Sequence, residues 1–109
     1  SSLQIIDTQE GTGAPAKAGD TIEVNYTGVL PDGTVFDASA NHGSTFKFTL
    51  GGGQVIKGLD QGLLGMKVGG TRIVAIPPDL AYGDRAMGKI PANASLIFQV
   101  ELVSIGGAQ

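Results

Sequence analysis

The chain has 109 residues, which suits a single domain, and 41% of them are hydrophobic, enough to form a core. The formal net charge is −3 and the seven Lys and Arg residues are scattered singly, so no surface for binding a nucleic-acid backbone is predicted. The sequence has no cysteine, which excludes disulfides and thiolate chemistry, and no apolar run reaches the ~18 residues of a membrane span.

Alternation of apolar and polar residues predicts that most of the chain is strand. In the second predicted strand, Ile22, Val24 and Tyr26 face one side and polar residues face the other, as in a half-buried strand. Pro31 and Gly33 then predict a turn, because proline presets φ and glycine supplies φ > 0, so a hairpin follows. In chain order the predicted strands are 3–7 at an edge, 21–29, 35–36, 46–50, 71–76 and 96–105.

One stretch alone has helical spacing. Over residues 55–66, Ile56, Leu59 and Leu63 recur at i, i+3 and i+7, which places them on one face. This helix contains poor helix formers, each costing roughly 1 kcal/mol relative to alanine, at Gly58, Gly62 and Gly65. It therefore needs a sheet to pack on. The pattern predicts a single α+β domain over 1–109, with five to six antiparallel strands wrapped on one short helix.

Several common reaction classes lack the residues that they need. The only histidine, His42, is predicted to be a surface loop residue, and one histidine without cysteine is too few for an ordinary zinc site. No serine lies in a G-x-S-x-G nucleophile motif. The glycines at 51–53 lack the Lys-Ser/Thr of a phosphate-binding loop, so a turn is the better interpretation. The sequence predicts no metal and no cofactor.

The carboxylates divide into ordinary and unusual positions. Asp32 is interpreted as a turn residue and Asp60 as a solvent-facing helix residue. Asp37 directly follows Phe36 in an otherwise uncharged run, so a partly buried carboxylate is one interpretation and a turn or N-cap residue is the other. A buried carboxylate needs hydrogen bonds, and Tyr26, across the predicted hairpin, is a candidate donor.

Two predicted loops remain, at 37–45 and 78–95. Long ordered loops in small domains are often functional. Tyr82 lies in the second loop within a short apolar run, so we expect it to line a cleft with its hydroxyl available to a ligand. Phe48 is assigned to the core. From spacing alone the sequence predicts a small α+β domain with an apolar, aromatic-lined pocket.

Short strings along the chain carry a more specific signal, because they occur in a fixed order and spacing. They are VNYTG at 24–28, DGTVFD at 32–37, FKFTLG at 46–51, VIKG at 55–58, GMKVG at 65–69, IPP at 76–78, AYG at 81–83, IPANA at 90–94 and FQVEL at 98–102. Together these strings closely resemble the FKBP-type peptidyl-prolyl cis-trans isomerases over essentially the whole chain. The strings at 65–69 and 76–78 favour the bacterial branch of that family.

The resemblance implies a twisted antiparallel sheet curling around the helix, with a pocket between them. It also implies non-covalent rotation about X-Pro bonds, assistance to protein folding, and binding of proline-containing peptides, proteins and macrolide inhibitors by a monomer. The alternative is a catalytically weak protein-binding module with the same fold. A general chaperone, and a sugar hydrolase using Asp37 with a second acid, are further alternatives. The compartment is left open between cytoplasmic and, if a leader precedes Ser1, periplasmic or secreted.

By matching position, the resemblance implies two groups of site residues. The catalytic group is Tyr26, Phe36, Asp37, Ile56, Tyr82 and Phe98. The group that binds substrate or inhibitor is Phe46, Gln54, Val55, Leu59, Met87 and Ile90. The Ile56 N–H and the Tyr82 hydroxyl would hydrogen-bond ligand carbonyls, and Asp37, held by Tyr26, would face the twisted amide.

Three positions depart from the family pattern. Leu59 stands where the family usually has tryptophan on the pocket floor, and His42 stands where many members have arginine near the aspartate. The loop at 84–89 is about one residue short, which alters the surroundings of Met87, Lys89 and Ile90. We expect activity to be retained, with altered efficiency and weaker macrolide inhibition.

Overall fold

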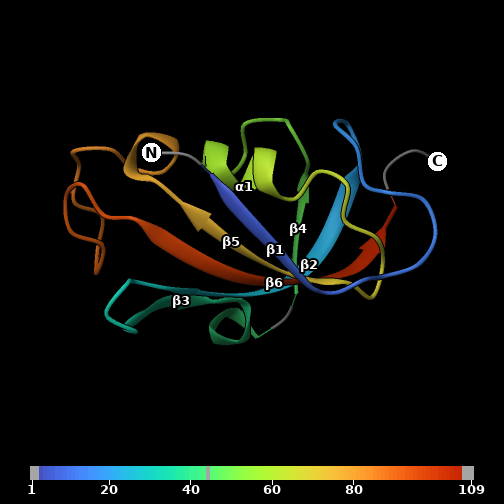
Figure 1. The fold of residues 1–109 in the computed structure, drawn as a ribbon, viewed down its shortest axis with the longest axis horizontal. Coiled ribbons are helices and arrows are strands. Elements are labelled where there is room, and N and C mark those ends of the chain that lie inside the picture. Colours follow the sequence, from blue (N-terminus) through green and yellow to red (C-terminus); the bar gives the residue numbers. More distant parts are fainter. Residues whose placement is uncertain (1–2, 44, 107–109) are drawn as a thin grey trace.

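A computed structural model describes residues 3–43 and 45–106, apart from the side chain of His42. One antiparallel six-stranded sheet dominates the described part of the chain. Its strand order is β1 (Gln4–Gln9), β5 (Thr71–Ile76), β6 (Leu96–Ile105), β2 (Thr21–Val29) and β3 (Val35–Ala38), with β4 (Phe46–Thr49) also paired to β2. Helix α1 (Lys57–Gly62) lies across one face of the sheet (Figure 1). The predicted α+β fold is confirmed.

Three strands match their predicted bounds residue for residue: β2, β5 and β6. The edge strand β1 continues beyond its predicted end to Gln9 after an irregularity that begins at Asp7. Strand β3 contains Asp37 and Ala38, for which a loop was predicted, because these residues pair with Gly28 and Thr27 of β2. A short 3-10 turn, η1 (Ser39–His42), then leads out of the sheet.

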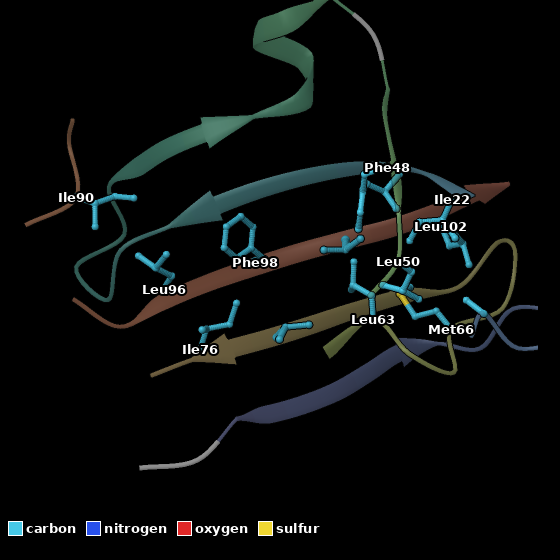
Figure 2. Close-up of a cluster of buried hydrophobic side chains, with 14 of the residues drawn as sticks. Ile22, Phe48, Leu50, Leu63, Met66, Ile76, Ile90, Leu96, Phe98 and Leu102 are labelled. Atoms are coloured by element: carbon cyan, nitrogen blue, oxygen red, sulfur yellow. The ribbon is translucent and has the colours of Figure 1, made fainter. Parts of the chain in front are cut away.

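The core lies on the face of the sheet that α1 covers, and Figure 2 shows its buried side chains along the strands. Alternate residues of β2, β5 and β6 point into it, which is the period-2 pattern of a sheet with one covered face. The largest fully buried side chains are Ile22, Leu50, Leu63, Ile76, Leu96, Leu102, Val74 and Val100. Phe48 is also buried, as predicted.

Helix α1 is shorter than its apolar pattern predicted. Ile56 is extended, with φ −60° and ψ 153°, and the helix ends at Gly62, with Leu63 as its C-cap and a positive φ of 86° at Gly65 beyond it. The two glycines inside the helix have a packing role. A Cβ at Gly58 would lie 2.4 Å from Ile76 Cγ2, and one at Gly62 would lie 2.7 Å from Val74 Cγ1. Glycine therefore lets the helix backbone lie directly on β5.

A buried arginine ties the end of this helix to the sheet. Arg72 of β5 is only 8% exposed, and its Nη1 donates to the carbonyl oxygens of Gly62 at 2.9 Å and Leu64 at 2.7 Å. Its Nε donates to Asp7 Oδ1 of β1 at 2.6 Å. Carbonyls at a helix C-terminus lack partners within the helix, so Arg72 satisfies that of Gly62, together with that of Leu64 just beyond the helix, and joins three elements.

Candidate functional site

A pocket of ≈ 440 Å³ opens between α1, the sheet and the 78–95 loop. Every predicted site residue lines it, so the structure brings both predicted groups together: Tyr26, Phe36, Asp37, Phe46, Gln54, Val55, Ile56, Leu59, Tyr82, Met87, Ile90 and Phe98. The prediction missed the deeper lining residues Val24, Phe48, Leu63 and Val100. A signal for them was present, because three lie two residues along a strand from a predicted wall residue and Leu63 lies one helical turn after Leu59.

Aromatic rings in mutual contact form the pocket wall. Tyr26 packs 6.0 Å from Phe46 and 6.1 Å from Phe98, centroid to centroid, and Phe36 meets Phe98 edge-on at 5.4 Å and 88°. These are the tilted and T-shaped arrangements that aromatic pairs prefer. Gly28 of β2 lies beneath two of the rings, since a Cβ there would be 2.5 Å from Phe36 Cζ and 3.0 Å from Phe98 Cε2. The absence of a side chain at Gly28 makes room for the wall.

The carboxylate of Asp37 is held in place within this apolar lining. The Tyr26 hydroxyl donates to Asp37 Oδ2 at 2.9 Å, and the Ala38 N–H donates to Asp37 Oδ1 at 2.9 Å. Buried Ser39 accepts the Tyr26 N–H at 3.0 Å, so the same tyrosine is fixed at its backbone as well. The predicted Tyr26–Asp37 contact is confirmed. The side chain of His42, predicted to lie near this carboxylate, is outside the described residues.

The Tyr26 phenol is kept neutral. Burial, followed by the hydrogen bond to Asp37 and its negative charge, raises the pKa of Tyr26 to about 12 from an ordinary 10.0. Tyr26 is therefore a protonated donor throughout the physiological range, and the negative charge of the pair stays on the carboxylate.

This shift predicts a loss of stability in alkaline solution. Because the phenol is a weaker acid in the folded protein, the unfolded chain loses its proton first as the pH rises. The free energy of unfolding is therefore expected to be unaffected by Tyr26 below about pH 10 and to fall between about pH 10 and about pH 12. Phenolate absorbance and denaturant titrations measure this, since the chain has two tyrosines and no tryptophan. In Tyr26→Phe, the rise in phenolate absorbance near pH 12 should vanish. Its persistence in this variant would contradict the assignment of the raised pKa to Tyr26.

The pocket entrance is apolar and partly exposed. Phe46, Tyr82 and Met87 are 39%, 36% and 47% exposed, whereas Ile90 is buried. Met87 and Ile90 exchange two backbone hydrogen bonds of 2.8 Å, which closes a small hairpin at the loop tip. The loop also begins with a 3-10 turn, η2 (Pro78–Leu80), so a segment without predicted structure is locally ordered. Lys89 does not line the pocket.

Beside the helix, the rim offers backbone and amide groups. Leu59 is half-buried on the helix side of the pocket. Gln54 Oε1 accepts the Thr49 N–H at 2.9 Å, which ties the rim to the end of β4. The Ile56 N–H donates to no carbonyl within residues 3–43 and 45–106, although it belongs to a pocket-lining residue. A ligand carbonyl could accept this hydrogen bond.

The residues of the pocket are suited to binding a ligand and changing its conformation. Residues 3–43 and 45–106 contain no group of three or more histidine, cysteine, aspartate or glutamate residues placed to hold a metal ion. No helix in the same ranges is long and apolar enough to cross a membrane. The pocket combines apolar walls, one carboxylate and a few hydrogen-bond donors, which can desolvate and orient a small apolar segment.

Comparison with known proteins gives a consistent result. The family model described as FKBP-type peptidyl-prolyl cis-trans isomerase matches residues 13–103. The chain is 55% identical over 109 residues to FK506-binding protein 1A of Neurospora crassa, covering 98% of this chain and 91% of that protein. It is 56% identical over 104 residues to FK506-binding protein 2 of Yarrowia lipolytica, covering 94% and 72%. The crystal structure of AtFKBP13 superposes with a TM-score of 0.89 at 40% identity, covering 95% and 93%.

These relatives correct one expectation. The strings at 65–69 and 76–78 favoured a bacterial branch, but the curated relatives above 50% identity include fungal FK506-binding proteins. Both strings lie at structural positions, a turn after α1 and the end of β5, so they report on the fold more than on lineage.

Proposed function

Because the chain belongs to the FKBP-type peptidyl-prolyl cis-trans isomerases, we propose that its aromatic pocket is the site where the X-Pro bond of a bound peptide rotates. The protein is a peptidyl-prolyl isomerase. The observation that carries the assignment of the site is the pocket itself, which is lined mostly by apolar and aromatic side chains and has a single carboxylate, Asp37, held by Tyr26.

The pocket can lower the rotation barrier without a covalent step. Amide resonance keeps the peptide bond planar, with a barrier of roughly 18–20 kcal/mol. The twisted transition state has lost that resonance, so its carbonyl is less polar than the planar amide. An apolar pocket therefore binds the twisted form relatively better, and only such differential binding accelerates a reaction. A difference of ~4 kcal/mol gives about a thousandfold acceleration.

The residue roles follow from this chemistry. Phe36, Phe98 and the Tyr26 ring enclose the prolyl ring, and Asp37 faces the rotating amide. The Ile56 N–H hydrogen-bonds a peptide carbonyl outside the rotating bond, and the Tyr82 hydroxyl hydrogen-bonds another carbonyl of the bound peptide. The other lining residues bind the flanking side chains or an inhibitor: Phe46, Gln54, Val55, Leu59, Met87 and Ile90. The neutral Tyr26 supports this arrangement, because it holds the carboxylate and leaves it charged.

The decisive test is cis–trans exchange of a Leu-Pro peptide, measured by NMR with and without the protein and then with FK506. Accelerated exchange that FK506 suppresses would establish the reaction and its location in the pocket. Peptide binding without acceleration would favour the runner-up, a protein-binding module, and would contradict the catalytic roles. Direct observation of exchange needs no coupling protease, which could cut the glycine-rich loops.

Inhibitor binding comes to this chain by analogy with its relatives, which are named FK506-binding proteins. We propose that FK506 occupies the same pocket above Leu59. The pocket also suits proline-containing protein segments, and we propose that the protein acts on them as a monomer, with residues 1–109 forming one isomerase domain that assists folding.

Leu59→Trp is expected to tighten FK506 binding about tenfold. An indole at this position adds apolar area beneath the ligand, and ~60 Å² at ~25 cal/mol per Å² gives ~1.5 kcal/mol. Titration by the fluorescence of the new tryptophan, the only one in the chain, measures the Kd. Leu64→Trp is the matched control, because Leu64 is 42% exposed and lies outside the pocket lining. Equal Kd values for Leu59→Trp and the unmodified protein, by an inhibition assay, would contradict the expected role of Leu59.

A further inference from the structure

The loop between β4 and α1 contains three successive glycines, Gly51 to Gly53, which form the glycine loop. Gly51 and Gly53 have φ of 79° and 76°, a region that glycine enters without steric cost. Pocket-lining residues stand on both sides of the loop, with Phe48 before it and Val55 after it. Glycine has the largest backbone freedom of any residue, so this loop needs an anchor if the segments beside it are to hold a fixed geometry.

Asp60 of α1 supplies that anchor. Its Oδ1 accepts the Gly51 N–H at 2.9 Å, and its Oδ2 accepts the Gly53 N–H at 3.0 Å. Both carboxylate oxygens are thus engaged with the two ends of the glycine loop. The prediction that Asp60 simply faces solvent was incomplete, because the carboxylate reaches back toward the chain that precedes the helix.

The same residue also contacts the backbone of Ile56. The Asp60 N–H donates to the Ile56 carbonyl oxygen at 3.2 Å, so one residue links the glycine loop to the start of the helix. Asp60 itself does not line the pocket. We propose that Asp60 is a positioning residue of the isomerase, which fixes the glycine loop and thereby aims the Ile56 N–H into the pocket. This inference rests on the proposed role of the Ile56 N–H.

Asp60→Asn tests it. The substitution keeps the size of the side chain, removes its charge and replaces one acceptor oxygen with an NH₂ group facing an N–H donor. Because the Ile56 N–H holds a carbonyl outside the rotating bond, its contribution is the same in ground state and transition state, and its loss raises KM without changing kcat. We expect KM for a Leu-Pro peptide to rise about fivefold, with kcat unchanged within twofold.

Two further variants separate positioning from stability. Asp32→Asn is the matched control, since the Asp32 carboxylate also accepts a backbone N–H, that of Thr34 at 2.9 Å, and lies outside the pocket lining. Its KM should equal that of the unmodified protein. Asp60→Glu keeps both acceptor oxygens and should recover most of the lost affinity. All are compared at a temperature where thermal unfolding shows each variant to be folded.

Amide NMR gives a readout that is independent of turnover. In the unmodified protein, the peptide should shift the Ile56 N–H resonance, and in Asp60→Asn this shift should shrink while the Gly51 and Gly53 amides exchange faster with solvent. Unchanged KM and shift in Asp60→Asn would overturn the proposal, as would a loss of kcat alone or an equal effect in Asp32→Asn. If the unmodified protein accelerates cis–trans exchange of the peptide but its Ile56 N–H resonance does not shift, the proposed role of Ile56 fails and this proposal fails with it. If the unmodified protein does not accelerate cis–trans exchange, the proposed function itself fails.

Discussion

Gly28→Ala is expected to lower kcat/KM about a hundredfold. The added methyl would lie 2.5 Å from Phe36 Cζ, closer than carbon atoms approach one another, and 3.0 Å from Phe98 Cε2, a contact so tight that the ring must shift. Gly28 pairs with Asp37 of β3 on one side and with Phe98 of β6 on the other. The methyl therefore forces Phe36 and Phe98 toward the space that we assign to the prolyl ring. A loss of ~3 kcal/mol in transition-state binding corresponds to this factor.

The change adds no polar group, so its effect on activity isolates the geometry of the wall. Overpacking also costs about 1–3 kcal/mol of stability, and the measurement of kcat/KM must be made where denaturant titration shows a folded variant. Gly106→Ala is the control, because a Cβ there has nothing within 4 Å. A folded Gly28→Ala protein with full activity would show that these ring positions do not govern the reaction.

Arg72→Ala is expected to cost the most stability, about 2–4 kcal/mol in the free energy of unfolding. The substitution leaves the carbonyl oxygens of Gly62 and Leu64 without their donor and opens a void beside β5. It also breaks the ion pair with Asp7, whose side chain is 43% exposed and can be solvated. The carbonyls are thus the larger part of the effect.

Urea titration measures the loss in the free energy of unfolding. The variant Asp7→Asn then shows how much of this loss comes from the ion pair and how much from the carbonyl contacts. Asparagine at this position removes the charge of the exposed partner and leaves both carbonyl contacts of Arg72, so we expect a cost below about 1 kcal/mol. Equal costs for Arg72→Ala and Asp7→Asn would mean that the ion pair, and not the helix end, supplies the stability.

The sequence was sufficient to predict an element and its bounds where a local pattern of apolar residues determines the structure. Strands β2 and β6 have one covered face, so apolar residues alternate plainly and the bounds were correct. The helix was predicted too long because Val55 and Met66 continue its apolar pattern for other reasons: one lines the pocket and the other is buried beyond the helix end. An apolar side chain reports burial, and burial alone does not distinguish a helix from the loops beside it.

The lining of the pocket was predictable from family strings, whereas the hydrogen bonds that support it were not. Every predicted site residue lines the pocket, and the Tyr26–Asp37 bond was expected across a hairpin. The bonds of Arg72 and Asp60 were missed, because each joins a side chain to backbone atoms of another element and no sequence spacing marks such a contact. The role of Gly28 in making room for the pocket wall could not be predicted either, because it depends on how closely the rings of Phe36 and Phe98 pack against this residue.

The position of β6 has a kinetic consequence. This strand follows the five others in the described residues, yet it lies between β5 and β2 near the middle of the sheet (Figure 1). It carries Phe98 of the pocket wall. Its pairing with β2 joins residues as far apart in the sequence as Ile22 and Ile105. Folds dominated by such distant pairings form in milliseconds to seconds, more slowly than those with local contacts. A chain still emerging from the ribosome therefore has no complete pocket until β6 has been made and inserted.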